Sequence, residues 1–133
     1  MGNISWLAVV LAAASGFLIG GLWYGPLFLK TWQREAGIGH DEMSKRHPAW
    51  VFGGAFVLQL VAAVMLAHMY AASQVTSLRT HLMMASGIAI AFIATAIGVN
   101  YLFAGKSVKL WAIDAGYYLV TYTLMGAIFA YLG

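Results

Sequence analysis

The 133-residue chain has no cysteine and little charge, and both absences exclude classes of protein. Without cysteine there is no disulfide, no thiolate metal site and no thiol nucleophile. Only 8% of the residues are charged, whereas a soluble domain carries about a quarter. Because 62% are apolar, we expect a single membrane domain spanning residues 1–133. The net charge of +3 is modest and does not indicate nucleic-acid binding.

Four long apolar runs cover about residues 5–29, 50–71, 82–104 and 110–132. Each reaches the roughly 20 residues that a spanning helix needs. Irregular backbone cannot face lipid, so the sequence predicts an all-α polytopic fold with four transmembrane helices. The first run is not read as a signal peptide, because "MGNISW" carries no positive charge.

The basic residues predict the orientation in the membrane. The loops 30–49 and 105–109 hold six of the seven, namely Lys30, Arg34, Lys45, Arg46, Lys106 and Lys109. The loop 72–81 holds only Arg79, and the ends of the chain hold none. By the positive-inside rule, 30–49 is a cytoplasmic loop and both termini lie outside.

The first run carries a strip of small residues and a helix break. Ala12, Gly16 and Gly20 recur every four residues, a spacing that lets helices approach closely. The partner of this strip could be another helix of the chain or a second protomer. Gly25 and Pro26 then predict a disruption near the cytoplasmic interface, after which the chain leaves at an angle. Packing is the simpler interpretation of this region, and a substrate gate is the alternative.

A polar cluster is predicted at one depth. Asn100 lies seven residues before the centre of the loop 105–109, and Asp114 lies seven after it. In an antiparallel hairpin both side chains reach the same level, more than a turn inside the membrane, and Tyr24 reaches a similar one. One helical face then carries the stripe Asp114, Tyr118, Thr121 and Met125, flanked by Tyr117 and Tyr122.

An aspartate at a helix centre costs about 2.5–3.5 kcal/mol, so partners should offset the cost. Asn100, nearby tyrosines or the loop lysines could supply them. Three interpretations stay open: a structural hydrogen-bond knot joining helices one, three and four, a site for a proton, cation or polar substrate, and an interfacial Asp114 that points to water.

Histidines and methionines gather at the other end. His68 and His81 flank the loop 72–81, among Met65, Met69, Met83 and Met84. Imidazoles and thioethers could hold a metal or haem, but methionine also fills gaps in apolar cores. Core packing is favoured, and no cofactor is expected. His40 and His47 are interpreted as solvated loop residues. No hydrolase or phosphate-binding motif is present, so we expect no enzymatic activity.

Two short echoes suggest an internal repeat. "GLWYGPLF" resembles "GVNYLF", and "WVFGGAF" resembles "WAIDAGY". The echoes favour a parallel repeat of two helical hairpins about an axis along the membrane normal.

Longer stretches carry a family resemblance. "GFLIGGLWYGPLF" and "YLFAGKSVKLWAIDAGYYLVTYTLMGAIFA" resemble the small bacterial four-helix membrane proteins grouped as domain of unknown function 1761. The resemblance covers nearly the whole chain and implies the same topology in a bacterial cytoplasmic membrane. It singles out Trp23, Tyr24, Pro26, Asn100, Asp114 and Tyr117, and it implies no activity.

Three functions remain open on the sequence. The first is a small oligomeric transporter or channel that uses the Asp114–Asn100 region. The second is a non-catalytic membrane protein that binds lipid or a protein partner. The third is a metal or haem carrier at His68 and His81. Membrane lipid and a second copy of the chain are the expected partners, and the small-molecule or ion ligand is left open.

Overall fold

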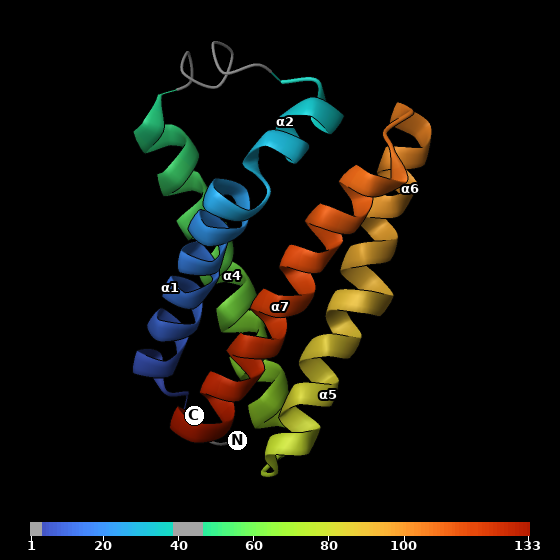
Figure 1. The fold of residues 1–133 in the computed structure, drawn as a ribbon. Coiled ribbons are helices and arrows are strands. Elements are labelled where there is room, and N and C mark those ends of the chain that lie inside the picture. The colour runs from blue at the N-terminus through green and yellow to red at the C-terminus, as the bar shows by residue number, and fades with distance from the viewer. Residues whose placement is uncertain (1–3, 39–46) are drawn as a thin grey trace.

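A computed structural model describes residues 4–38 and 47–133 of the chain. Its elements are α1 (Trp6–Leu22), η1 (Trp23–Leu27), α2 (Leu29–Ala36), α4 (Pro48–Ser73), α5 (Leu78–Ile88), η2 (Ala89–Ala94), α6 (Thr95–Ala104) and α7 (Val108–Leu132) (Figure 1). The η elements are π-helical: η1 continues α1 and ends before the non-helical Phe28, and η2 joins α5 to α6 without a break. Four helical stretches are long and apolar enough to cross a membrane: Trp6–Leu27, Pro48–Ser73, Leu78–Ala104 and Val108–Leu132. The predicted all-α fold with four spans is confirmed.

Serine side chains and glycine turns set the helix ends. Ser107 caps α7 by accepting a hydrogen bond from the backbone N–H of Leu110 at 3.1 Å, and Ser77 caps α5 in the same way. Such a cap satisfies a backbone donor that has no partner inside the helix. Gly105 has φ 70° directly after α6, a left-handed conformation that glycine adopts without strain. The short turn therefore returns α7 alongside α6.

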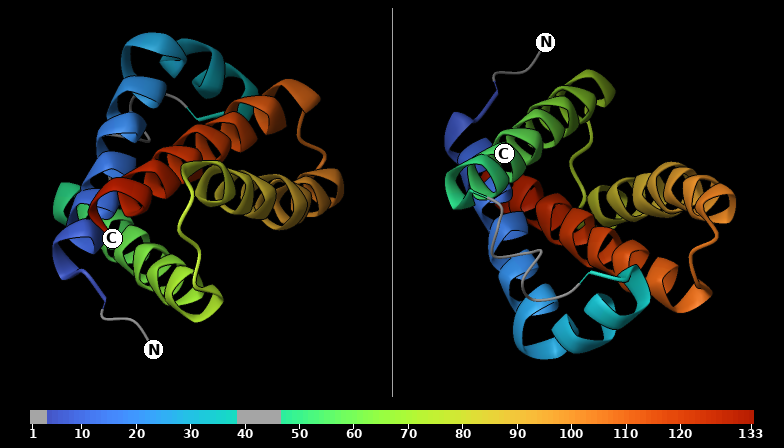
Figure 2. Two further views of the ribbon diagram at one scale, coloured as in Figure 1. Left: turned by 90° about the horizontal axis from the view of Figure 1, so that it is seen from below. Right: turned by 90° about the horizontal axis from the view of Figure 1, so that it is seen from above.

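Helix α7 is the centre of the bundle. It contacts α1 on one side and α5 with η2 on the other, while α4 packs against α1. Both end-on views place α7 between α1 and the α5–α6 span (Figure 2). The core combines alanines, such as Ala8, Ala12 and Ala63, with larger side chains such as Met125 and Phe129. Small residues suit this core because they let helix backbones approach closely.

The small-residue strip of α1 faces the inside of the protomer. Ala12 is fully buried. A Cβ at Gly16 would lie 2.8 Å from Oε1 of Gln59 in α4 and 2.9 Å from Cγ2 of Thr121 in α7. A Cβ at Gly20 would lie 3.4 Å from the Tyr117 hydroxyl. The strip thus meets two helices of its own chain, which settles the partner that the sequence left open.

The first span ends in a π-helical turn that contains Pro26. Proline lacks the N–H that a regular helix needs, so a turn of altered hydrogen bonding at this position is expected. After Phe28, α2 begins and turns away from the axis of α1 toward the start of α7 (Figure 1). The structure thus places a break at Gly25 and Pro26, with the following helix at an angle.

The third span holds a second π-helical segment, η2, that the sequence did not predict. The Trp111 indole N–H donates to the Ala94 carbonyl in it at 2.8 Å. The Trp111 indole nitrogen also lies 3.2 Å from the position of a Cβ on Gly98. A side chain from α7 therefore stabilises the altered backbone at its end.

The suggested repeat of two hairpins stays a prediction. Its matched tryptophans have different surroundings, because Trp50 is 82% exposed whereas Trp111 donates a hydrogen bond to η2.

Candidate functional site

Asp114 lies at the meeting point of three spans. It is only 7% exposed and sits six residues into α7, about 9 Å along the helix axis. The Tyr24 hydroxyl of η1 donates to its Oδ1 at 2.5 Å, and the Tyr101 hydroxyl of α6 donates to its Oδ2. The interpretation of Asp114 as an interfacial residue pointing to water is therefore wrong. Two phenol donors supply the hydrogen bonds that a buried carboxylate requires.

The register of η1 against α7 is fixed beside this contact. The Trp23 indole N–H donates to the Ile113 carbonyl at 2.8 Å. The same ring lies 3.1 Å from the position of a Cβ on Gly116, so a side chain there would press tightly against it. Trp23 thereby anchors the turn that carries Tyr24. The consecutive residues Trp23 and Tyr24 therefore bind the consecutive residues Ile113 and Asp114 of α7.

A cavity of about 470 Å³ opens beside Asp114. Its walls come from η1, α2, α6 and α7, and its lining residues are Tyr24, Leu29, Trp32, Ile97, Asn100, Tyr101, Asp114 and Tyr118. The rings of Tyr24 and Trp32 meet edge to face with centroids 5.8 Å apart. The cavity is thus mostly aromatic and apolar, with a carboxylate in its wall.

Asn100 differs from its expected role. It is exposed and lines the same cavity as Asp114, but within the described residues no hydrogen bond joins the two side chains. Its neighbour Tyr101 makes the contact instead. Successive residues of a helix point about 100° apart. The sequence therefore predicted the depth of Asn100 in the membrane, but it did not predict which of the neighbouring side chains, Asn100 or Tyr101, points at Asp114.

A second polar contact lies deeper along α7. The Tyr117 hydroxyl donates to the Gly16 carbonyl of α1 at 2.8 Å and accepts from Nε2 of Gln59 in α4 at 2.6 Å. Thr121 is fully buried one turn further on. Tyr117 therefore joins spans one, two and four, and Tyr118 faces the cavity. The predicted polar stripe thus serves two different sites.

Sequence reasoning missed Gln59 and assigned no specific contact to Tyr101. The signal for Gln59 was available, because it is the only strongly polar residue in the apolar run from 50 to 67. A polar side chain in a span must find a partner in protein or water. The signal for Tyr101 was the echo of "GLWYGPLF" in "GVNYLF", which aligns Tyr101 with Tyr24 and places both near Asp114.

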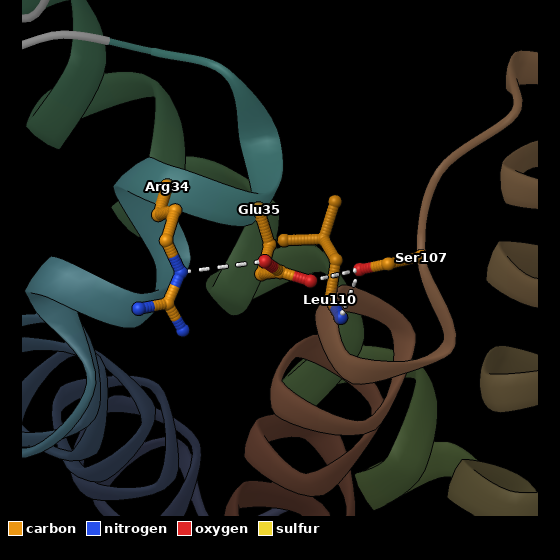
Figure 3. Close-up of polar contacts among 4 residues, drawn as sticks. All are labelled: Arg34, Glu35, Ser107 and Leu110. Carbon is orange, nitrogen blue, oxygen red and sulfur yellow. Dashed lines mark hydrogen bonds and ion pairs between the residues drawn. The ribbon is translucent and has the colours of Figure 1, made fainter.

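Helix α2 is held onto the turn between α6 and α7. The Ser107 hydroxyl donates to Oε1 of Glu35 at 2.7 Å (Figure 3), and the Lys106 ammonium donates to the Ala36 carbonyl at 3.2 Å. The hydrogen bond from Ser107 holds the pKa of Glu35 below its usual range, and Arg34, 3.5 Å away, acts in the same direction. These contacts fix the wall that carries Leu29 and Trp32.

The histidines do not form a pair. His81 is 5% exposed and its ring lies 4.3 Å from that of Tyr70, whereas His68 is exposed on α4. Positions 68 and 70 point about 200° apart on a helix, so His68 faces away from this contact. No group of three potential metal-ligating residues occurs within residues 4–38 and 47–133. His47 caps α4 by accepting from the Ala49 N–H, and His40 lies outside the described residues.

Comparisons with known proteins identify the family of the chain. The family model described as "Protein of unknown function (DUF1761)" matches residues 7–130, which is nearly the whole chain. No curated protein and no solved structure matches the chain. The match confirms the resemblance that the sequence motifs indicated. The chain belongs to the DUF1761 family.

Proposed function

We propose that this multi-pass membrane protein is a small transporter and that the Asp114 cavity is its substrate site. One observation carries the proposal: a nearly buried carboxylate stands in the wall of a cavity of about 470 Å³ inside an apolar span. An ionisable residue within a span is costly and usually marks a substrate, ion or proton path. A binding and transport role, without catalysis, agrees with the residues in the cavity.

Two walls of the cavity contain or adjoin π-helical backbone, beside the contacts that hold η1 and α2 to α7 and its preceding turn. Tyr24 lies in η1, and Ile97 follows η2 by three residues. Irregular turns of this kind occur often at functional sites. Small changes in η1 would move Tyr24 and the attached α2 together. Such a change is what access from alternate sides of a membrane requires.

We further propose that the cavity lies toward the cytoplasmic side of the cytoplasmic membrane. The basic loops 30–49 and 105–109 support this orientation, with both termini outside. The cysteine-free chain allows a direct test. Cysteine introduced at Val108, which is exposed beside Lys109, should react with an impermeant maleimide only after cells are permeabilised. Cysteine at Ser73 should react in intact cells, and the reverse pattern would refute the orientation.

Self-association is also proposed, because four helices enclose a small volume. The glycine strip no longer supports it, since that strip packs within the protomer. The remaining support is the outward face of α4, which exposes Val57, Leu58 and Val61. Self-association is tested by measuring the mass of the purified protein in lipid nanodiscs. A uniform monomer at all protein concentrations would contradict it.

A lipid- or partner-binding role is the second candidate. It is favoured by the position of α2, which would lie at the membrane interface and lines the cavity with Leu29 and Trp32. A lipid headgroup could then occupy the cavity without being moved across the membrane. The two roles differ in whether solute crosses the bilayer.

A liposome flux assay separates the roles. Wild type and Asp114→Asn are reconstituted, and uptake is measured for protons, small cations and small neutral amphiphiles. The transporter proposal expects uptake of at least one solute that Asp114→Asn abolishes, while the variant stays folded because its amide can still accept from a tyrosine hydroxyl. No difference for any solute would refute transport. Asp114→Leu tests the structural knot, and a well-folded Asp114→Leu protein would exclude it.

A further inference from the structure

The chemistry of the cavity narrows the class of its ligand. Among the described residues that line it, Asp114 is the only charged side chain. None of these described lining residues is a lysine, arginine or histidine, so the wall they form would repel an anion. A largely buried carboxylate attracts a cation more strongly than an exposed one, because water screens its charge less. The charge of the ligand is therefore the first property that the cavity selects.

The carboxylate keeps room for such a ligand. An ionised carboxylate has two oxygens with about four acceptor positions. Tyr24 occupies one position on Oδ1, and Tyr101 occupies one on Oδ2. The remaining positions can accept from, or lie against, a cation in the cavity. The two phenols also fix the direction of the carboxylate before a ligand arrives, which lowers the cost of binding.

Aromatic rings make up half of the cavity lining. They come from four segments, with Tyr24 in η1, Trp32 in α2, Tyr101 in α6 and Tyr118 in α7. Ring faces attract cations, and groups of aromatic residues recognise ammonium ions that carry alkyl substituents. Leu29 and Ile97 add apolar wall that would contact alkyl groups. This surface suits a cation that is large and weakly hydrated.

Other cations fit the cavity less well. Calcium and magnesium require about six or more oxygen ligands, and the cavity offers one carboxylate, the Asn100 amide and phenols. A proton would need no aromatic walls and no cavity. The volume of about 470 Å³ lies in the range of about 300–1,000 Å³ typical of small-molecule sites. An organic cation therefore uses every feature present.

We propose that the Asp114 cavity binds small organic ammonium cations. The Asp114 carboxylate would face the ammonium group, and the aromatic rings would surround its alkyl substituents. This inference rests on the proposed substrate site and adds the class of its ligand. Asp114, Tyr24 and Trp32 are its principal contacts.

The test compares two probes of the same shape. Choline carries a trimethylammonium group, and 3,3-dimethyl-1-butanol replaces that group by a neutral tert-butyl group. Binding to the protein in lipid nanodiscs is measured by calorimetry. Choline should bind about tenfold or more tightly than the alcohol, and Asp114→Asn should remove most of this difference.

Tryptophan variants supply a second arm that does not depend on the carboxylate. Trp32→Ala should weaken choline binding several-fold, because it removes one aromatic wall. Trp50→Ala is the matched control, since Trp50 is 82% exposed and does not line the cavity. Equal effects of the two variants would overturn the aromatic role.

The outcomes separate this inference from the proposed function. Equal binding of choline and the alcohol, or no binding of choline to folded protein, overturns the cation class. If Asp114-dependent uptake of another solute is then observed in liposomes, the transporter proposal survives. If choline binds as expected but no solute crosses the bilayer, the ligand class stands and transport fails.

Discussion

At the scale of single residues, the sequence "DAGY" in α7 carries three separate interactions. Asp114 accepts from two tyrosines, Gly116 leaves room for the Trp23 ring, and Tyr117 donates to the Gly16 carbonyl. Four consecutive residues of a helix point in different directions, so one short motif contacts the other three spans when Gln59 is included. A change at any of these positions should affect a different contact.

Removing either tyrosine hydroxyl at Asp114 should destabilise the protein. Tyr24→Phe and Tyr101→Phe each leave one carboxylate oxygen without its donor, at a cost of about 1–3 kcal/mol. Unfolding in detergent, followed by heat or by added SDS, measures the effect. Tyr131→Phe is the control, because Tyr131 is largely exposed. If all three variants unfold at the same temperature and SDS concentration as wild type, the two hydrogen bonds contribute nothing to stability.

Gly16 should not tolerate a side chain, whereas Gly21 in the same helix should. A Cβ at Gly16 meets Gln59 and Thr121 within 3 Å, while a Cβ at Gly21 meets nothing within 4 Å. Gly16→Ala should therefore cost about 1–3 kcal/mol of stability through overpacking. Gly21→Ala should be neutral or slightly stabilising. Equal stability of the two variants in the same detergent assay would show that α1 packs differently.

At the scale of elements, the sequence predicted the four spans and the break at Pro26, because apolar length and proline chemistry are local signals. It did not predict η2, since "AIAFIA" contains no proline or glycine and the altered turn is completed by Trp111 from another helix. The choice of Tyr101 over Asn100 and the pairing of Gln59 with Tyr117 depend on helix rotation. That rotation is fixed only when all four helices pack.

The docking of α2 should depend on pH. The Ser107 hydroxyl lowers the pKa of Glu35 from its ordinary value of 4.5. Because docking lowers the pKa of this carboxyl, the stabilisation that the contact gives is complete when the pH is above the ordinary pKa. It is lost as the pH falls through the lowered pKa of the docked state. Acidification below the ordinary value should therefore weaken the Ser107 contact and loosen α2 on the turn 105–107, where the Lys106 contact to the Ala36 carbonyl remains.

Spin labels provide the measurement. Cysteines at Lys30 and Val108, both exposed, can be labelled without background because the chain has no cysteine. The distance between the labels should be narrowly distributed at pH 7 and broad at pH 3. In Glu35→Gln, which cannot titrate, the distribution should be the same at both values. A pH-independent distance with Glu35 intact would show that this contact does not hold α2.

At the scale of the whole molecule, α7 organises the bundle through its two polar contacts. Asp114 joins spans one, three and four, and Tyr117 joins spans one, two and four. The cavity forms where α2 and α6 stand on either side of α7. A fold with little apolar driving force between its helices in lipid thus takes its specificity from buried polar groups, and one of them also faces the cavity.

Accessibility of the cavity to a charged reagent tests the central claim most directly. Ile97→Cys places a thiol in the cavity wall, and Val61→Cys places one on the exposed apolar face of α4. In lipid nanodiscs, the rate of a trimethylammonium methanethiosulfonate at the cysteine in position 97, relative to its sulfonate counterpart, should exceed the same ratio for a free thiol in water, and Asp114→Asn should remove this excess. The cysteine at position 61 should resist both reagents. A thiol at position 97 that is inert to both reagents, or a preference that is unchanged in Asp114→Asn, would contradict an accessible cavity whose charge is set by Asp114.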